Sequence, residues 1–77
     1  MKELVEVIAK ALVDNPDEVI VTQTVEEDGI IVLKLNVARE DMGKVIGKKG
    51  RIAKSIRTVV KTVAIKENKK VVVDIVD

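Results

Sequence analysis

The Asp28-Gly29 pair separates two stretches whose composition is typical of β-strands. Both Glu18 to Val25 and Ile30 to Val37 are rich in Val, Ile, Leu or Thr, and the second alternates between two faces. Asp-Gly supplies the positive φ that a tight hairpin turn requires. Two strands joined by so short a turn should pair antiparallel.

Three stretches with helical periodicity flank this hairpin, and a last strand pattern follows them. The helices are expected at Lys2 to Val13, Arg39 to Ile46 and Arg51 to Lys66, and the strand at Lys70 to Val76. The order is α-β-β-α-α-β. A crossover through two helices normally joins parallel strands with right-handed connectivity, so the second strand should be central. We therefore predict a single α+β domain over residues 1–77, with a three-stranded mixed sheet covered on one face by three helices.

Apolar spacing predicts which side of each main helix faces the sheet. The first helix should bury Leu4, Val5, Ile8, Ala11 and Leu12. The last helix should bury Ile52, Ile56, Val59, Val60 and Val63, with Ala53 and Ala64 beside them. On the sheet face away from the helices, Ile30, Val32, Val72 and Val76 would form an apolar patch, which we interpret as a partner surface.

The 77-residue chain contains no Cys, no His and no aromatic residue. Thiolate metal sites, disulfides and the usual general base are therefore excluded. The acidic groups fall in expected turns, where Asp stabilises the local backbone, and we predict no catalytic residue, metal or cofactor. Glu3 and Glu6 interrupt the apolar N-terminus, and no apolar run approaches the length of a membrane span, so we expect no membrane contact and a cytoplasmic location.

Charge is strongly segregated although the net charge is only +1. Residues 1–38 carry three bases and eight acids, whereas residues 39–70 carry eleven bases and three acids. Between Lys44 and Lys61 there are seven bases and no acid. This pattern favours an anionic partner for the middle of the chain, although a solvated basic helix face would look the same.

The most informative motif is Gly47-Lys48-Lys49-Gly50, which lies between two helical patterns. Glycine permits a sharp reversal and a close approach of another backbone. A helix that begins after Gly50 would direct its free N–H groups and positive dipole end at the loop, which favours a phosphate. A plain interhelical turn is the alternative, and the two lysines between the glycines argue against it.

Other glycine motifs do not fit. The spacing G-x-x-x-x-G-K-[ST] of a P-loop fails because Lys48 stands where the second glycine is required, counting from Gly43. The dinucleotide-binding pattern G-x-G-x-x-G fails because position 45 is Val.

The stretch from Val45 to Ile52 resembles the signature of KH domains, RNA-binding modules whose GXXG loop clamps four backbone nucleotides. The order of elements is similar to the type II KH arrangement, and the whole chain resembles the KhpA family of small single-KH bacterial proteins. The resemblance implies that residues 47–50 contact the RNA backbone, that Ile46, Ile52 and Ile56 lie under the bases, and that nearby cations assist. The residues predicted to bind RNA are Ile46, Gly47, Lys48, Lys49, Gly50, Arg51, Ile52, Lys54, Ile56 and Arg57.

This resemblance implies a non-catalytic adaptor or RNA chaperone that binds single-stranded RNA and pairs with itself or with another KH-domain protein. Three alternatives stay open from the sequence. Single-stranded DNA could be the ligand, because a loop that grips phosphates need not read the 2′-hydroxyl. The chain could be a dimerisation module without RNA binding. A small nuclease would need a carboxylate site, yet the acids lie away from the basic loop.

Overall fold

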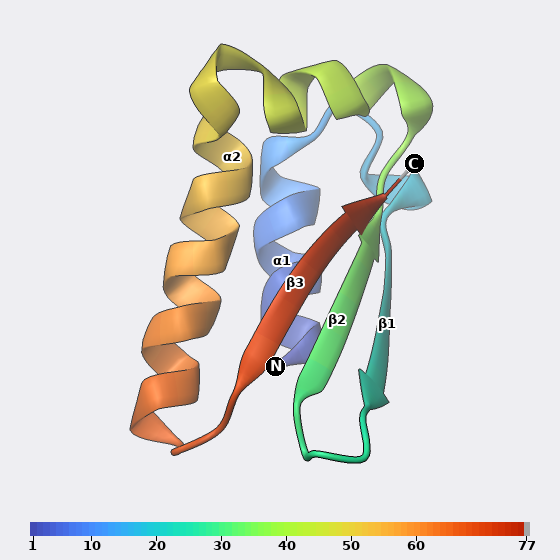
Figure 1. Cartoon of the computed structure of the whole chain (residues 1–77). Coiled ribbons are helices and arrows are strands. Elements are labelled where there is room, and N and C mark those ends of the chain that lie inside the picture. Colours follow the sequence, from blue (N-terminus) through green and yellow to red (C-terminus); the bar gives the residue numbers. More distant parts are fainter. Residues whose placement is uncertain (77) are drawn as a thin grey trace.

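The computed structural model describes residues 1–76, except for the side chains of Lys48 and Lys49. Its elements are α1 (Lys2–Leu12), a short 3-10 helix η1 (Pro16–Glu18), β1 (Ile20–Val25), β2 (Ile31–Asn36), α2 (Arg39–Lys66) and β3 (Val71–Val76). Strand β2 is central, antiparallel to β1 and parallel to β3. The predicted α-β-β-α-α-β topology and mixed sheet are confirmed (Figure 1).

The two middle helices are the two arms of α2. Figure 1 shows a first arm that crosses one end of the sheet and a long arm that descends beside β3. Gly50, with φ +67°, lies at the bend. The sequence predicted two helices with an interruption over residues 47–50. The left-handed φ of Gly50 divides α2, which spans Arg39–Lys66, into these two arms.

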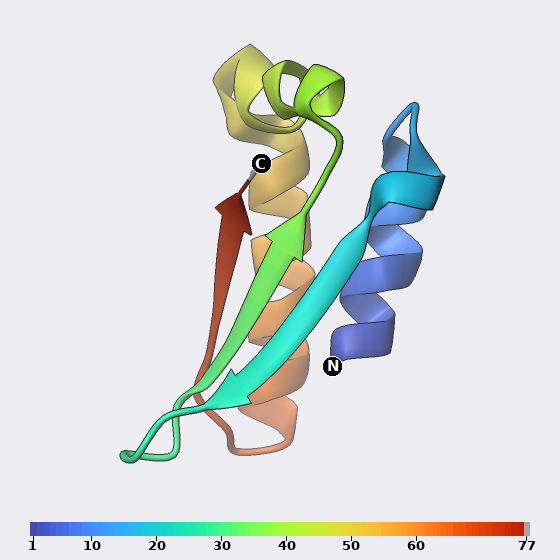
Figure 2. The ribbon, with the colours of Figure 1, turned by 90° about the vertical axis from the view of Figure 1, so that its right-hand side faces the viewer.

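The sheet has one buried and one open face. Helices α1 and α2 pack against β1, β3 and each other on the same side, as the two views show (Figures 1 and 2). The side chains of Val21, Leu33, Leu35 and Val73 point to that side and are buried. This alternation follows from the period of two along each strand. Val32 and Val72 alternate with these residues and lie on the face away from the helices, as predicted.

The buried helix faces differ from the prediction by a fraction of a turn. In α1, Val5 and Ala9 are buried, whereas Ala11 and Leu12 are exposed. In the long arm of α2, the buried residues are Ala53, Ile56, Val60 and Ala64, while Val59 is exposed. Small alanines let the helix axis approach the sheet closely, so they occupy the contact line that the larger residues were expected to fill.

The strand β1 starts later than predicted because of Pro16. The sequence predicted a strand from Glu18, but Pro16 begins the 3-10 helix η1, which delays the start of β1 to Ile20. Proline suits the first position of such a turn because its fixed φ is already helical and it has no N–H to satisfy. Val19 follows η1 and is buried, so it joins this connection to the core.

Candidate nucleic-acid interface

The bend in α2 places the glycine motif at one end of the molecule, away from the β1–β2 hairpin (Figure 1). Gly47 and Gly50 are partly exposed. A Cβ added at either position would meet no atom within 4 Å. Packing in the folded chain therefore does not require either glycine, and only Gly50 has a backbone conformation that favours one.

Three of the predicted cations follow the motif along α2. Arg51, Lys54 and Arg57 lie on the long arm with exposed side chains. Within the described residues, the cations of the ion pairs are Met1, Lys44 and Lys69. The three cations on the long arm therefore have no acidic partner among those residues. Lys48 and Lys49 lie between the glycines, but their side chains are outside the described part of the chain, and their predicted contacts stay predictions.

The three predicted isoleucines have different environments. Ile46 is 52% exposed at the end of the first arm, and Ile52 is half-buried. Ile56 has no exposed surface and belongs to the core. A ligand on the folded protein can touch Ile46 and Ile52, but it cannot reach Ile56. The side chain of Ile56 packs the long arm against the core, and its predicted place under the bases stays a prediction.

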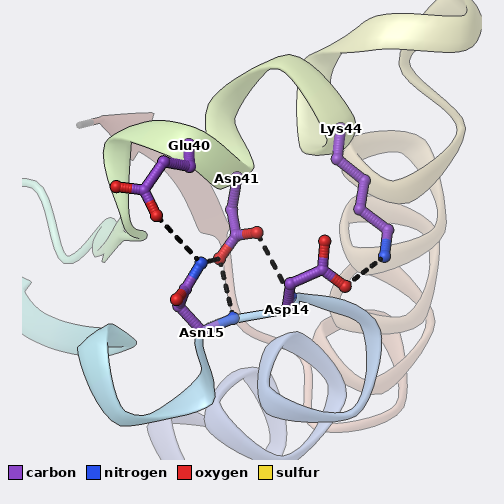
Figure 3. Close-up of polar contacts among 5 residues, drawn as sticks. All are labelled: Asp14, Asn15, Glu40, Asp41 and Lys44. Atoms are coloured by element: carbon purple, nitrogen blue, oxygen red, sulfur yellow. Dashed lines mark hydrogen bonds and ion pairs between the residues drawn. The ribbon is translucent and has the colours of Figure 1, made fainter.

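The first arm is held in place by a buried carboxylate that the sequence analysis had not singled out as functional. Asp41 is 1% exposed and is the only buried charged side chain among residues 1–76 with described side chains. It accepts hydrogen bonds from the backbone N–H of Asp14 at 3.2 Å, and from the backbone N–H and Nδ2 of Asn15 at 3.0 Å and 3.2 Å (Figure 3). These bonds join the connection after α1 to the arm that ends at Gly47.

Two weaker contacts flank this cluster. Asn15 Nδ2 also donates to Glu40 Oε2 at 3.4 Å, and Lys44 Nζ lies 3.1 Å from Asp14 Oδ1 (Figure 3). Burial from water raises the pKa of Asp41. The hydrogen bonds from Asn15 and Asp14, together with the Lys44 charge, lower it more, so its pKa lies below the ordinary 3.8. Asp41 is therefore ionised in the folded protein at neutral pH.

A cavity of about 510 Å³ lies between the long arm of α2 and the edge of β3. Its residues are mostly apolar, and its four cationic members are Arg57, Lys61, Lys69 and Lys70. Arg57 is the only residue that it shares with the predicted site. The sequence predicted Lys69 in a turn and Lys70 at the start of the last strand. Only the return of β3 alongside α2 brings the two lysines to the same cavity as Lys61.

The chain is similar in sequence to proteins of one known family. The sequence model of the KhpA/KhpB KH-domain family matches residues 2–75. The chain belongs to the KhpA/KhpB KH-domain family. A relative from Clostridium perfringens, named RNA-binding protein KhpA, is 68% identical over 76 residues, covering 99% of this chain and 100% of the relative.

Other members of the KhpA/KhpB family match over the same length. Relatives of the same name from Caldanaerobacter subterraneus and Listeria monocytogenes are 60% and 49% identical, covering 99% and 100% of this chain and the whole of each relative. No solved structure matches the chain significantly. In residues 1–76, no helix is long and apolar enough to cross a membrane.

Proposed function

We propose that this protein binds single-stranded RNA, with Gly47 to Gly50 contacting the sugar-phosphate backbone and Ile46 and Ile52 lying against the bases. The observation that carries the proposal is the bend at Gly50, which leaves an open glycine motif beside exposed cations that have no acidic partner within the described part of the chain. Relatives named RNA-binding protein KhpA support the same ligand class.

Phosphate attraction supplies most of the affinity in this proposal. With about two to four phosphates neutralised, log K should fall with log salt with a slope of roughly −1.4 to −2.8. Apolar contact with Ile46 and Ile52 adds modest base preference. The chain lacks the aromatic side chains that stack bases in other RNA-binding folds, so a single site should bind weakly.

The decisive experiment replaces the loop charges and keeps both glycines. Lys48→Asp with Lys49→Asp should abolish binding of a mixed-sequence single-stranded RNA, measured by fluorescence anisotropy. Lys2→Asp with Lys10→Asp makes the same change in net charge on α1 and should weaken binding much less. Equal loss in both double variants would mean that net charge, not the loop, holds the RNA. Parallel titration with DNA of the same sequence tests selectivity for the 2′-hydroxyl.

Weak binding by one site makes pairing useful, because two linked sites raise the effective concentration of the second. We infer that the protein acts in the cytoplasm as a non-catalytic adaptor and pairs with itself or with another KH-domain protein. The open sheet face supports this: Val72 is 51% exposed, and its neighbour across the parallel ladder is Val32. Ile20 is also exposed on this face.

Association can be assigned to a surface by comparing two matched substitutions. Val72→Asp alters the open sheet face, and Val59→Asp alters an exposed position on the long arm of α2. If the sheet face mediates pairing, analytical ultracentrifugation should find Val72→Asp monomeric at a concentration where Val59→Asp still associates. If the unaltered protein is strictly monomeric at high concentration, the proposal of self-association fails. Pairing with a different KH-domain protein would then be the remaining form of the proposal.

A further inference from the structure

Strand β1 lies at one edge of the sheet, and its outer side is open. In residues 1–76 its strand neighbour is β2, with Ile20 opposite Asn36 at one end and Val25 opposite Ile31 at the other. Figures 1 and 2 show β3 on the other side of β2, so no further strand covers β1 in the described part of the chain. An edge of six residues is therefore available for more hydrogen bonds.

The turn after β1 determines which backbone groups point outwards. The N–H of Glu26 donates to Ile30 O at 2.9 Å, so these two residues form a hydrogen-bonded pair of the antiparallel ladder. Such pairs alternate with pairs whose backbone groups point away from the partner strand. Counting back from Glu26, the N–H and C=O groups of Val21, Gln23 and Val25 point to the open edge. Within the described residues, no backbone hydrogen bond outside the ladder engages them.

This edge lacks the features that usually prevent strands from pairing. Natural edge strands are protected by lysine, proline, bulges or shortness. Strand β1 has the sequence IVTQTV, without charge or proline. Ile20 is 61% exposed and Val25 is 63% exposed, and they point to opposite faces because they are an odd number of positions apart. The edge thus combines open backbone groups with an apolar side chain on each face that a partner strand can cover.

Acidic residues lie at both ends of this neutral strand. Asp17 and Glu18 precede it in η1, and Glu26, Glu27 and Asp28 follow it in the hairpin turn. None of these acids forms an ion pair with the described residues. An extended segment that pairs with β1 therefore has negative charge near each of its ends, whichever way it runs.

These charges disfavour a second copy of the chain as the occupant. If two β1 strands pair antiparallel, the η1 acids of each copy approach the hairpin acids of the other. If they pair parallel, each group of acids approaches its own counterpart. Both arrangements place like charges together at both ends, which destabilises strand pairing. The edge instead matches a strand of a different protein, with a neutral centre and basic ends.

We infer that the edge of β1 is a docking site for an extended segment of another protein, as long as β1, with a neutral β-branched centre and Lys or Arg at both ends. The segment adds a strand to the sheet, and its backbone bonds to Val21, Gln23 and Val25 supply affinity. Its basic ends, which face the two acidic groups, supply selectivity and faster association.

This docking site is separate from the proposed RNA site. The long arm of α2 lies beside β3, on the opposite side of the sheet from the outer edge of β1 (Figure 1). An occupied edge therefore leaves the bend of α2 and its cations accessible. The inference does not depend on RNA binding, and each of the two proposals can fail without the other.

The first test measures the binding of a labelled synthetic peptide by fluorescence anisotropy. The peptide has a centre of alternating Val and Thr, equal in length to β1, and a pair of lysines at each end. The unaltered protein should bind it, and a matched peptide with glutamates in place of the lysines should bind on the order of tenfold more weakly. Absence of binding by the basic peptide, or equal binding of both peptides, would overturn the inference.

Charge reversal on the protein provides a matched comparison. Glu26→Lys with Glu27→Lys should weaken binding of the basic peptide on the order of tenfold and strengthen binding of the acidic peptide. Glu3→Lys with Glu67→Lys makes the same change in net charge at exposed positions outside the edge and should alter either affinity little. If both double variants have equal effects, the peptide responds to net charge alone and the docking site is wrong.

Hydrogen exchange locates the bound peptide on the unaltered protein. The amides of Val21, Gln23 and Val25 should exchange more slowly in the complex, because they gain acceptors. The amides of Thr22 and Thr24 already face β2 and should change little. Gln23→Pro removes an N–H that points away from β2, which edge strands tolerate. This variant should bind the peptide on the order of tenfold more weakly.

Other occupants would give other exchange patterns. If the protein alone at high concentration protects Val21, Gln23 and Val25, the edge binds a second copy and the inference is overturned. Protection of the same amides by mixed-sequence single-stranded RNA would overturn it in favour of a nucleic acid. A basic peptide that binds but leaves these amides unprotected would show that it docks elsewhere.

Discussion

Asn15 donates two hydrogen bonds to the carboxylate of Asp41, one from its backbone N–H and one from its side-chain amide. The two residues are 26 positions apart in the sequence. Asn15 precedes η1, and Asp41 lies in the first turn of α2, four residues before the fully buried Val45. Positions four apart share a helix face, so a polar contact of Asp41 and the burial of Val45 in the core both hold this side of the arm against the rest of the protein.

Removing the Asp41 charge should loosen this arm. Asp41→Asn keeps the size of the side chain but replaces one acceptor oxygen with an amide donor that faces existing N–H donors. We expect the melting temperature to fall by about 5 °C and RNA affinity to fall with it. Glu40→Gln, an exposed neighbour with a single long hydrogen bond, is the control and should change neither. A core variant with the same melting temperature as Asp41→Asn serves as a second control. If it binds RNA normally, the affinity lost by Asp41→Asn comes from the position of the arm and not from lower stability.

Acid should remove the contribution of Asp41. Because its folded-state pKa lies below its ordinary value, its ionised form stabilises the fold above the unfolded-state pKa. That stabilisation is lost as the pH falls through the lower, folded-state pKa. The difference in unfolding free energy between the unaltered protein and Asp41→Asn should therefore be constant at neutral pH and should shrink below about pH 4. Urea titrations at several pH values measure it, and a difference that grows on acidification would contradict the assignment.

The two glycines of the motif should respond differently to alanine. Gly50→Ala forces a left-handed φ on a residue with a Cβ and should lower the unfolding free energy by about 1–2 kcal/mol. Gly47→Ala meets no clash and should stabilise the helix by up to about 1 kcal/mol.

RNA binding then distinguishes a structural glycine from a contact glycine. If the ligand backbone approaches Gly47, the stabilised Gly47→Ala protein should bind on the order of tenfold more weakly. Gly43→Ala, at another helical glycine with open space around it, is the matched control and should bind normally. Normal binding by Gly47→Ala would exclude a close backbone approach at that position.

Ile46 and Ile56 should separate binding from stability. Ile56→Ala removes a fully buried side chain and should cost about 2–5 kcal/mol of unfolding free energy. Ile46→Ala alters a half-exposed side chain and should cost no more than about 0.5 kcal/mol. Only the Ile46 variant should lose RNA affinity while it keeps a normal melting curve. An unchanged affinity would remove Ile46 from the interface.

Asn68 should tolerate glycine better than alanine. Its φ of +55° is the left-handed conformation that ends the long arm, and glycine adopts it without strain. Asn68→Gly should preserve the melting temperature, whereas Asn68→Ala should lower the unfolding free energy by about 1 kcal/mol. Circular dichroism melts of the two variants test this. Equal stability would mean that the turn adjusts its backbone.

Local pattern predicted the topology because each element had a clear period. The Asp28-Gly29 turn, the alternating strands and the helical crossover leave one simple arrangement of three strands, which is the one observed. The helix faces were less predictable, because hydrophobicity ranks Val59 above Ala53 and Ala64. The actual contact line depends on how closely the helix approaches the sheet, and that is a tertiary property.

The candidate site was only partly visible in the sequence for a similar reason. The motif at residues 47–50 and its basic neighbours are contiguous, so the sequence could indicate them. The sequence did not indicate the role of Asp41, since acids at the start of a helix, such as Glu40 and Asp41, usually interact with the helix dipole. Its partner Asn15 and the meeting of Lys61 with Lys70 depend on contacts between distant segments, which no local spacing encodes.

Because α2 bends at Gly50, a small change in the angle of the bend moves the far end of the long arm by several ångströms. One residue, Gly50, carries the reversed φ, and the helix beyond it extends by about 24 Å. A change of only about ten degrees at that pivot would displace the far end of the arm by about 4 Å, which is nearly the rise of three helical residues. The angle must therefore be set by what each arm rests on: Asp41 and Val45 on one side, Ile56 and Val60 on the other. Core substitutions far from any ligand should consequently change the angle between the first arm, which carries Ile46, and the long arm, which carries Ile52.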